Sequence, residues 1–312
     1  MSRGKHSSAP VLSGEVIETV GRRVRVRHAD EEIVCFLSGQ RAVIGDEVRF
    51  VRARGEGGKL TEVLPRKTRL ARVDHRGREQ VLAANLRGVV IVETANEPPL
   101  APVILDRYLV AAWRGGLRAM IALNKVDQPT PPEAQEQIAL RAACGVPTLE
   151  VSAHQGQGLE ALREAVREAG GAWALVGRSG VGKTSLVHAL LPHADAGPVG
   201  ELSAYWGLGK HTTTSSTRFE LGQGAALIDS PGIRSFTPAG LQVADLRTYF
   251  PGMSELRCAF RDCLHREGEQ GCTLEGAVHP ELVRSYRTLL TELLEIEAGT
   301  RRGRGEQEKR RT

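Results

Sequence analysis

The sequence has few aromatic residues and no long apolar run. Phe, Trp and Tyr make up 4% of the 312 residues. Phosphate contacts are therefore a more expected mode of binding nucleic acid than base stacking on aromatic platforms. No apolar stretch approaches the ~20 residues that a membrane-spanning helix needs. The first ten residues are polar and lack the apolar core of a secretory signal. We therefore expect a cytoplasmic protein.

A strong excess of one charge is also missing. The chain has 42 Lys and Arg against 37 Asp and Glu, a net charge of +5. This mildly basic balance is compatible with a nucleic-acid partner but does not establish one. With 41% hydrophobic and 25% charged residues, the composition is that of a globular protein. The length predicts two or three domains.

Cysteines are scarce, and three of the five crowd into one short segment near the C-terminus. In a cytoplasmic protein, such a cluster favours a metal site over disulfides. Three thiolates and one imidazole suit a tetrahedral Zn²⁺ site with no open position, which is a structural site. The alternative is three reduced cysteines in a compact loop. The candidate ligands are Cys258, Cys263, His265 and Cys272.

Up to about residue 68, short strand patterns are separated by glycine-containing turns. We expect strands over 11–20, 22–27, 32–37, 46–53 and 59–63. Five short strands in this length favour a small β-barrel of the OB type. Arg and Val alternate over 23–27, which places three arginines on one face. That face is either a solvated strand surface or a surface for an RNA backbone.

From residue 69 the pattern becomes α/β, with strands alternating with helices up to about residue 240. This alternation predicts a parallel sheet whose ligand sites lie beyond the carboxyl ends of the strands. The remainder, 241–312, holds the Cys/His cluster, a helix from about residue 280, and a basic tail. We therefore expect a multidomain protein: an RNA-binding OB-fold over 1–68, an α/β P-loop domain over 69–240 and a mainly α zinc-binding domain.

Residues 177–184 fit the P-loop pattern G-x-x-x-x-G-K-[ST], between a predicted strand and a predicted helix. The glycines let backbone N–H groups approach phosphate oxygens, and the helix N-terminus adds partial positive charge. Lys183 should reach the β- and γ-phosphates, and Thr184 should bind Mg²⁺. This motif alone leaves ATP and GTP open. The expected phosphate-binding residues are Gly177, Arg178, Ser179, Gly180, Val181, Gly182, Lys183, Thr184 and Ser185.

The purine is indicated by an N-K-x-D sequence at the end of another predicted strand. The Asp127 carboxylate can accept both N1–H and N2–H₂ of guanine, whereas adenine would leave it unsatisfied at a cost of about 1–3 kcal/mol. A backbone N–H near Ala153 can donate to guanine O6. The expected base-binding residues are Asn124, Lys125, Val126, Asp127, Ser152 and Ala153.

Residues 229–232 fit D-x-x-G after a short apolar strand. In that motif Asp229 holds Mg²⁺ through water, and the Gly232 amide senses the γ-phosphate. A threonine of the run 212–214, Thr212 or Thr213, should bind Mg²⁺ in the GTP state. The alternative interpretation of that run is a Thr-rich turn.

The order of these motifs is unusual, because N-K-x-D precedes the P-loop. With residues 64–67, 105–109, 211–214 and the 260–263 Phe-Arg-Asp-Cys sequence, the chain resembles the circularly permuted TRAFAC-class GTPases. Within them it resembles ribosome small subunit-dependent GTPase A. The resemblance covers nearly the whole chain. It implies late maturation of the small (30S) ribosomal subunit, contact with 16S rRNA, and GTP hydrolysis that the subunit stimulates.

The resemblance also implies one structural zinc with the ligand order given above, Mg²⁺ with GTP, and a monomer without a membrane partner. Ile233 stands where many GTPases place a water-orienting Gln, and Ile cannot orient water by hydrogen bonding. His211 is the candidate catalytic group, because similar proteins use the matching histidine in ribosome-stimulated turnover. The alternatives are a mobile-loop histidine and a GTP-gated RNA- or ribosome-binding module with negligible turnover.

Overall fold

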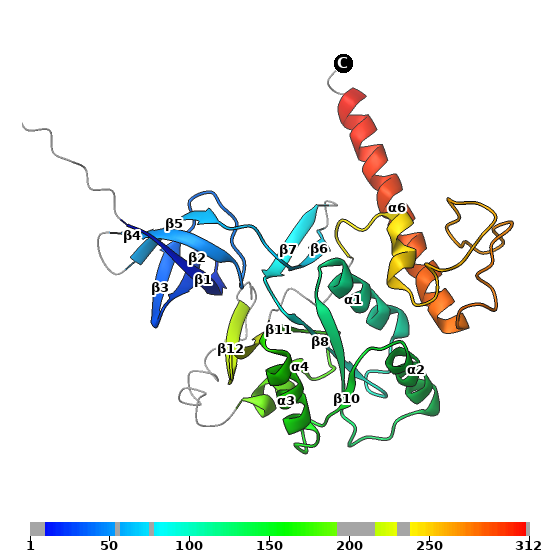
Figure 1. Cartoon of the computed structure of the whole chain (residues 1–312), viewed down its shortest axis with the longest axis horizontal. Helices are drawn as coiled ribbons and strands as arrows, with labels where there is room; N and C mark the ends of the chain where they lie inside the picture. Colours follow the sequence, from blue (N-terminus) through cyan, green and yellow to red (C-terminus); the bar gives the residue numbers. More distant parts are fainter. Residues whose placement is uncertain (1–9, 54–56, 75–77, 192–215, 230–237, 310–312) are drawn as a thin grey trace, which may run out of the picture.

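The computed structural model describes residues 10–53, 57–74, 78–191, 216–229 and 238–309. An N-terminal barrel is followed by a central α/β part and a C-terminal part (Figure 1). The barrel and the C-terminal part lie on opposite sides of the α/β part. No helix in the described part of the chain is long and apolar enough to cross a membrane.

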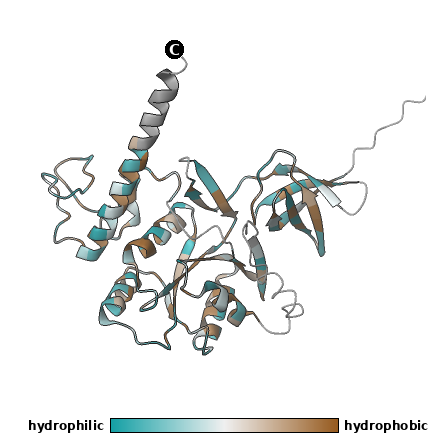
Figure 2. Ribbon diagram, turned by 180° about the vertical axis from the view of Figure 1, so that it is seen from behind, coloured by the Kyte–Doolittle hydropathy of each residue, from teal (hydrophilic) through white to brown (hydrophobic). Residues whose placement is uncertain are grey.

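The first five strands form the closed barrel that the sequence predicts. Their bounds are β1 Val11–Val20, β2 Arg23–His28, β3 Glu31–Phe36, β4 Glu47–Arg52 and β5 Gly57–Val63. β1 pairs with both β2 and β4, and β3 pairs with β5, which closes the ring. Val24 and Val26 are buried in the barrel core, so the arginines of β2 face outward. Figure 2 shows both hydrophobic and hydrophilic residues along these strands, as expected when one face is buried.

A two-stranded hairpin, β6 Arg69–Val73 and β7 Glu79–Ala84, follows the barrel. The sequence pattern does not predict this hairpin. It is held against the barrel by a bridge between Ile44 and Ala83. Arg66 makes two hydrogen bonds, of 2.7 and 2.9 Å, to the fully buried Asp46 carboxylate. The segment between barrel and hairpin is therefore fixed to the barrel.

The central part is a sheet with helices on both faces. Its elements are β8 Gly88–Thr94, α1 Pro102–Arg114, β9 Arg118–Asn124, α2 Pro132–Ala143, β10 Thr148–Glu150, α3 Leu159–Ala169, β11 Gly171–Val176, α4 Lys183–Leu190, β12 Ser216–Gly222 and β13 Ala225–Asp229. Their order is β10-β9-β8-β11-β13-β12, and only β12 runs antiparallel to its neighbour in this part.

Every residue of β8 is buried, and its two faces belong to different cores. Val89 and Ile91 pack with residues of α1 and α2, whereas Val90 and Val92 pack with residues of α3 and α4. The chain proceeds from β8 through β9 to β10 and then returns to place β11 on the other side of β8. A crevice at such a reversal, beyond the carboxyl ends of the strands, is where ligands bind in open α/β sheets.

The sheet continues from the α/β part into the barrel. β12 pairs antiparallel with β1, with Glu18 opposite Thr217. Arg218 also contacts Glu15 at 2.6 Å. The barrel is therefore joined by strand pairing to the strand that begins at residue 216.

The C-terminal part shares its core with helix α1. It contains a 3₁₀ helix, η2 Val243–Tyr249, the loops with the cysteines, and helix α6 Pro280–Lys309. Val110 of α1 is buried in the same cluster as Phe250 and Tyr286. Arg107 of α1 also contacts Glu292 of α6 at 2.5 Å. Apolar packing and an ion pair thus fix the C-terminal part to the α/β part.

Candidate nucleotide site and metal centre

The P-loop lies between β11 and α4, at the reversal of strand order. Gly180 and Gly182 have φ angles of +86° and +87°, a region that glycine adopts without strain. A Cβ atom at Gly177 would lie 2.3 Å from the Val92 carbonyl oxygen, and one at Gly182 would lie 2.4 Å from the Asn124 amide nitrogen. The glycines of the motif are therefore required by backbone conformation and by close packing.

Lys183 is the first residue of α4, and its side chain turns back over the loop. Its ammonium nitrogen donates to the carbonyl oxygens of Gly177 at 2.8 Å and Arg178 at 2.6 Å. The next residues, Thr184 and Ser185, are exposed in the first turn of the helix. The ammonium group therefore lies against the backbone of the loop, which is where a P-loop lysine contacts phosphate oxygens.

The Arg178 side chain is directed to Glu93, near the end of strand β8. Its guanidinium contacts the Glu93 carboxylate at 2.9 Å. Glu93 is fully buried, and this burial raises the pKa of its carboxyl group although the Arg178 cation opposes the shift. The Arg178 guanidinium is therefore held by Glu93. Sequence reasoning missed Glu93 because no motif contains it.

The segment 95–100, which follows β8, connects the P-loop to the base-binding segment. Arg178 donates to the Pro99 carbonyl oxygen at 2.6 Å. Lys125 donates from its ammonium group to the Glu97 carbonyl oxygen at 2.7 Å. Both halves of the expected nucleotide site are therefore hydrogen-bonded to the backbone of one short loop, residues 95–100.

Loss of the buried ion pair should weaken binding of every guanine nucleotide. In Glu93→Gln, Arg178 keeps a neutral partner but loses its counter-charge, so we expect stability to fall by about 2 kcal/mol. GDP and GTP affinities should fall together, by about tenfold, because the P-loop loses an anchor that both nucleotides use. Nucleotide titration and thermal unfolding would measure the two effects.

Glu97→Gln is the matched control, because the Glu97 side chain is exposed and only its backbone carbonyl oxygen binds Lys125. This variant should retain wild-type affinity. If Glu93→Gln lost stability yet bound GDP and GTP like the wild type, the ion pair would have no role in positioning the P-loop.

Asn124 joins the base-binding segment to the P-loop. Its side chain is buried at the end of β9, donates to the Val181 carbonyl oxygen at 2.9 Å, and accepts from the Ala153 amide at 3.1 Å. Lys125, with φ of +66°, and Val126 follow at the strand end. Three segments that are far apart in the sequence are therefore held together by one amide side chain.

Asp127 is exposed and oriented by a buried serine. Ser152 donates from its hydroxyl to an Asp127 carboxylate oxygen at 2.5 Å, and this hydrogen bond lowers the pKa of the carboxyl group. The residue as a whole is exposed, as a base-reading carboxylate requires. The Ala153 amide is already donated to Asn124. Within the described residues, no hydrogen bond of the His154 amide is found, which makes it an additional free donor at this turn.

Asp229 ends β13, the parallel neighbour of the P-loop strand β11, and is paired in register with Leu175. Its position at the carboxyl end of the strand places it on the same sheet edge as the P-loop. The other residues expected around Mg²⁺ and the γ-phosphate lie outside the described residues: His211, Thr212, Thr213 and Gly232.

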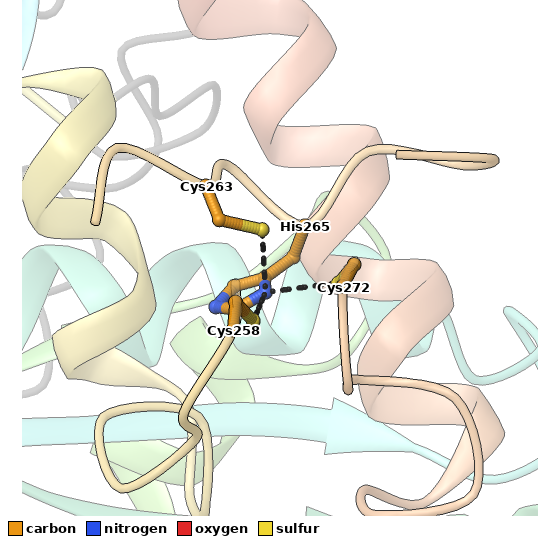
Figure 3. A group of neighbouring side chains, drawn as sticks. All are labelled: Cys258, Cys263, His265 and Cys272. Carbon is orange, nitrogen blue, oxygen red and sulfur yellow. Dashed lines mark hydrogen bonds between the residues drawn. The ribbon is translucent and has the colours of Figure 1, made fainter. Parts of the chain in front are cut away.

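The four Cys and His residues near the C-terminus do converge (Figure 3). Their candidate ligand atoms all lie within 4.8 Å of one another. The Nδ1 atom of His265 is 3.6, 3.5 and 3.3 Å from the sulfur atoms of Cys258, Cys263 and Cys272. This donor set, three sulfurs around one imidazole nitrogen, fits a closed tetrahedral zinc site.

Burial changes the pKa values of two groups in the cluster. It raises the pKa of the Cys263 thiol to about 12, so the thiolate needs a metal to be stable there. Burial also lowers the pKa of His265, which keeps the imidazole neutral, as a ligand must be. Helix α6 supports the loop, because Tyr286 donates to the Leu264 carbonyl oxygen at 2.8 Å and Arg287 to that of His265 at 3.1 Å.

The fold and the order of its motifs define the class of protein. A P-loop follows β11, N-K-x-D ends β9 and D-x-x-G begins at the end of β13, on one edge of a largely parallel sheet. This is a P-loop GTPase in which the chain order is circularly permuted while the spatial arrangement of strand ends is kept.

The comparisons with known proteins identify the family. The family profile described as RsgA GTPase matches residues 63–238. The chain is 40% identical over 305 residues to a small ribosomal subunit biogenesis GTPase RsgA of Azotobacter vinelandii, covering 92% of this chain and 88% of that one. It is equally similar to the protein of the same name from Pseudomonas fluorescens, with 40% identity covering 92% and 87%. The chain belongs to the RsgA GTPase family, and it is a GTP hydrolase.

Two solved structures share the whole architecture. The crystal structure of YjeQ from Thermotoga maritima matches with a TM-score of 0.71 and 25% identity, over 91% of this chain and 99% of that one. YloQ, described as a circularly permuted GTPase, matches with a TM-score of 0.66 and 20% identity, over 94% and 98%. The predicted combination of barrel, permuted GTPase domain and C-terminal cysteine-bearing part is thus confirmed as a fold.

Proposed function

We propose that this protein binds the small (30S) ribosomal subunit late in its maturation, that the subunit stimulates its GTP hydrolysis, and that hydrolysis is coupled to release. The observation that carries this proposal is the 40% identity over 92% of the chain to relatives named for biogenesis of that subunit. The subunit is assembled where ribosomes work, so the protein acts in the cytoplasm. We further propose that it acts as a monomer and that its partner surface is 16S rRNA.

The nucleotide would lie across the reversal between β8 and β11. The P-loop amides wrap its phosphates, and Lys183 exchanges its carbonyl partners for the β- and γ-phosphate oxygens. Mg²⁺ would be bound by Thr184 and, through water, by Asp229, with Thr212 or Thr213 joining in the GTP state. The metal supplies charge neutralisation at the phosphates.

The base would be read by Asp127, whose lowered pKa keeps the carboxylate ionised. That carboxylate accepts both donors of guanine, and the Lys125 stem lies along the base plane. The turn at Ala153 and His154 supplies the amide donor for O6, and the His154 amide, which has no hydrogen bond to the described residues, supports this assignment. The zinc ion would be structural, because all four ligands come from the protein and no position stays open.

Multiple-turnover GTP hydrolysis with and without purified 30S subunits tests the function. The proposal predicts slow turnover by the protein alone and faster turnover with the subunit. The competing hypothesis, a GTP-gated binding module, predicts GTP-dependent sedimentation with the subunit and negligible turnover in both conditions. Stimulation by 50S subunits alone would contradict the proposed partner.

We infer that His211 is the group through which the subunit stimulates hydrolysis, because Ile233 cannot orient water. His211→Ala should bind GTP like the wild type and lose about 10²-fold or more of the stimulated rate, the range of a lost general base or water-orienting group. Full stimulation of this variant by 30S subunits would remove His211 from the mechanism.

A further inference from the structure

Three exposed side chains form a row across the outer face of the barrel. In the sheet register, Arg23 of β2 lies opposite Phe36 of β3, and Phe36 lies opposite Lys59 of β5. Phe36 is 50% exposed, and the Arg23 guanidinium carbon lies 5.1 Å from the centroid of its ring. We call Arg23, Phe36 and Lys59 the cation–aromatic row.

The two cations of this row differ from the other cations on the barrel strands. Neither Arg23 nor Lys59 forms an ion pair within the described residues. The four other arginines of the barrel strands are paired with glutamates, as Arg25–Glu18, Arg27–Glu220, Arg49–Glu62 and Arg52–Glu31. The arginine stripe of β2 is therefore balanced over most of its length, and its uncompensated positive charge lies at the Arg23 end.

Exposed apolar surface gathers at the same end. Five large hydrophobic residues are exposed in the described part of the chain, and three of them are Phe36, Val34 and Val20. Val34 precedes Phe36 by two residues on the same strand, and Val20 of β1 lies opposite Arg23. An exposed aromatic ring between two unpaired cations matches a ligand that has a flat apolar face and negative charges on both sides. An unpaired nucleotide in a single strand has this chemistry.

We propose that the cation–aromatic row binds single-stranded RNA, with one unpaired base stacked on Phe36 and the flanking phosphates contacting Arg23 and Lys59. The inference rests on the proposed function for the RNA partner. Strands 2 and 3 of an OB barrel form a surface suited to oligonucleotides. An exposed cation–π contact is weaker than a base–aromatic stack, so a base displaces the Arg23 guanidinium from the ring and the guanidinium turns to a phosphate.

The stacking is tested with the full-length protein and a short fluorescein-labelled oligouridylate, by fluorescence anisotropy. Phe36→Ala should weaken binding by about tenfold, because one base–aromatic stack is lost. Phe36→Trp should restore it, because any large aromatic face stacks. The slope of log affinity against log salt should stay at the wild-type value in both variants, since no phosphate contact is removed.

The phosphate contacts are tested by charge removal. Arg23→Gln and Lys59→Gln should each reduce the salt slope by about 0.7, as expected for one lost phosphate contact on a single strand. Arg49→Gln is the matched control, because it removes the same charge from an exposed barrel position that is paired with Glu62. It should leave both affinity and slope unchanged.

Sedimentation of the same variants with 30S subunits separates this inference from the proposed function. If the wild type failed to bind 30S subunits, the proposed function would fail whatever the oligouridylate shows. Wild-type behaviour of Phe36→Ala on the oligouridylate, or no binding by the wild type, overturns the row as an RNA site. Loss of 30S binding by Phe36→Ala without loss of oligouridylate binding would also overturn it, because the row would then contact a ribosomal protein.

Discussion

Asp127→Asn should change the base preference of the nucleotide site from guanine to xanthine. Guanine presents two adjacent donors, N1–H and N2–H₂, and a carboxylate accepts both. An asparagine amide accepts one hydrogen bond and donates another, which matches the N1–H donor and C2 carbonyl acceptor of xanthine. We expect GDP affinity to fall by about 10²-fold and xanthosine diphosphate affinity to rise by a similar factor, because a mismatched polar pair leaves groups unsatisfied.

Competitive titration with guanosine, xanthosine and adenosine diphosphates in the presence of Mg²⁺ would measure this change. The structure favours a clean result, because Asp127 is exposed and accepts from the Ser152 hydroxyl, which can also donate to an amide oxygen. Glu150→Gln is a matched control, since it removes an exposed carboxylate at the end of the neighbouring strand β10. An Asp127→Asn variant that still preferred GDP over xanthosine diphosphate would show that another residue reads the base.

Cys263→Ser should remove the metal and unfold the loops around it. Cys263 is 3% exposed, and it supplies one of four ligands that are all drawn from residues 258–272. Structural zinc sites of this type contribute about 10–16 kcal/mol of binding free energy to the fold of small domains. In the described chain, no helix or strand lies between the end of η2 at Tyr249 and the start of α6 at Pro280. The loops of this region therefore depend on the ion.

We expect zinc content to fall from about one ion per chain to near zero, and hydrogen exchange over residues 250–279 to accelerate strongly. GDP affinity should change only severalfold, because none of the four candidate ligands belongs to the P-loop or to the base-binding segments. Cys144→Ala, a cysteine outside the cluster, is the control and should retain the metal. Full zinc content and unchanged exchange in Cys263→Ser would refute a structural metal centre at these residues.

The parts of the fold that the sequence predicts are those with local signals. The barrel strands carry alternating Val and polar residues, and residues 23–27 show this most clearly. β8 is a continuous apolar run because both of its faces are covered. The P-loop and N-K-x-D are recognised because each motif stands at a strand end, where a parallel sheet gathers its ligand site.

The parts that the sequence does not predict depend on contacts between distant segments. The Glu93–Arg178 pair joins two strand ends 85 residues apart, and nothing near Glu93 signals a charge in a buried strand. The antiparallel pairing of β12 with β1 joins the barrel to the GTPase sheet through two strands that are far apart in the sequence. The cation–aromatic row follows from strand register, which places Phe36 between Arg23 and Lys59. A low aromatic content makes base stacking less expected over the whole chain, but it says nothing about one exposed ring.

The most direct test of the central claim is a titration of the wild-type protein with GDP and with ADP under the same Mg²⁺ concentration. Because Asn124 holds the Asp127 strand end against the P-loop, one ligand should engage both, and we predict that GDP binds about 10²-fold or more tightly than ADP. Equal affinities for the two nucleotides would show that residue 127 does not read a base bound at this P-loop.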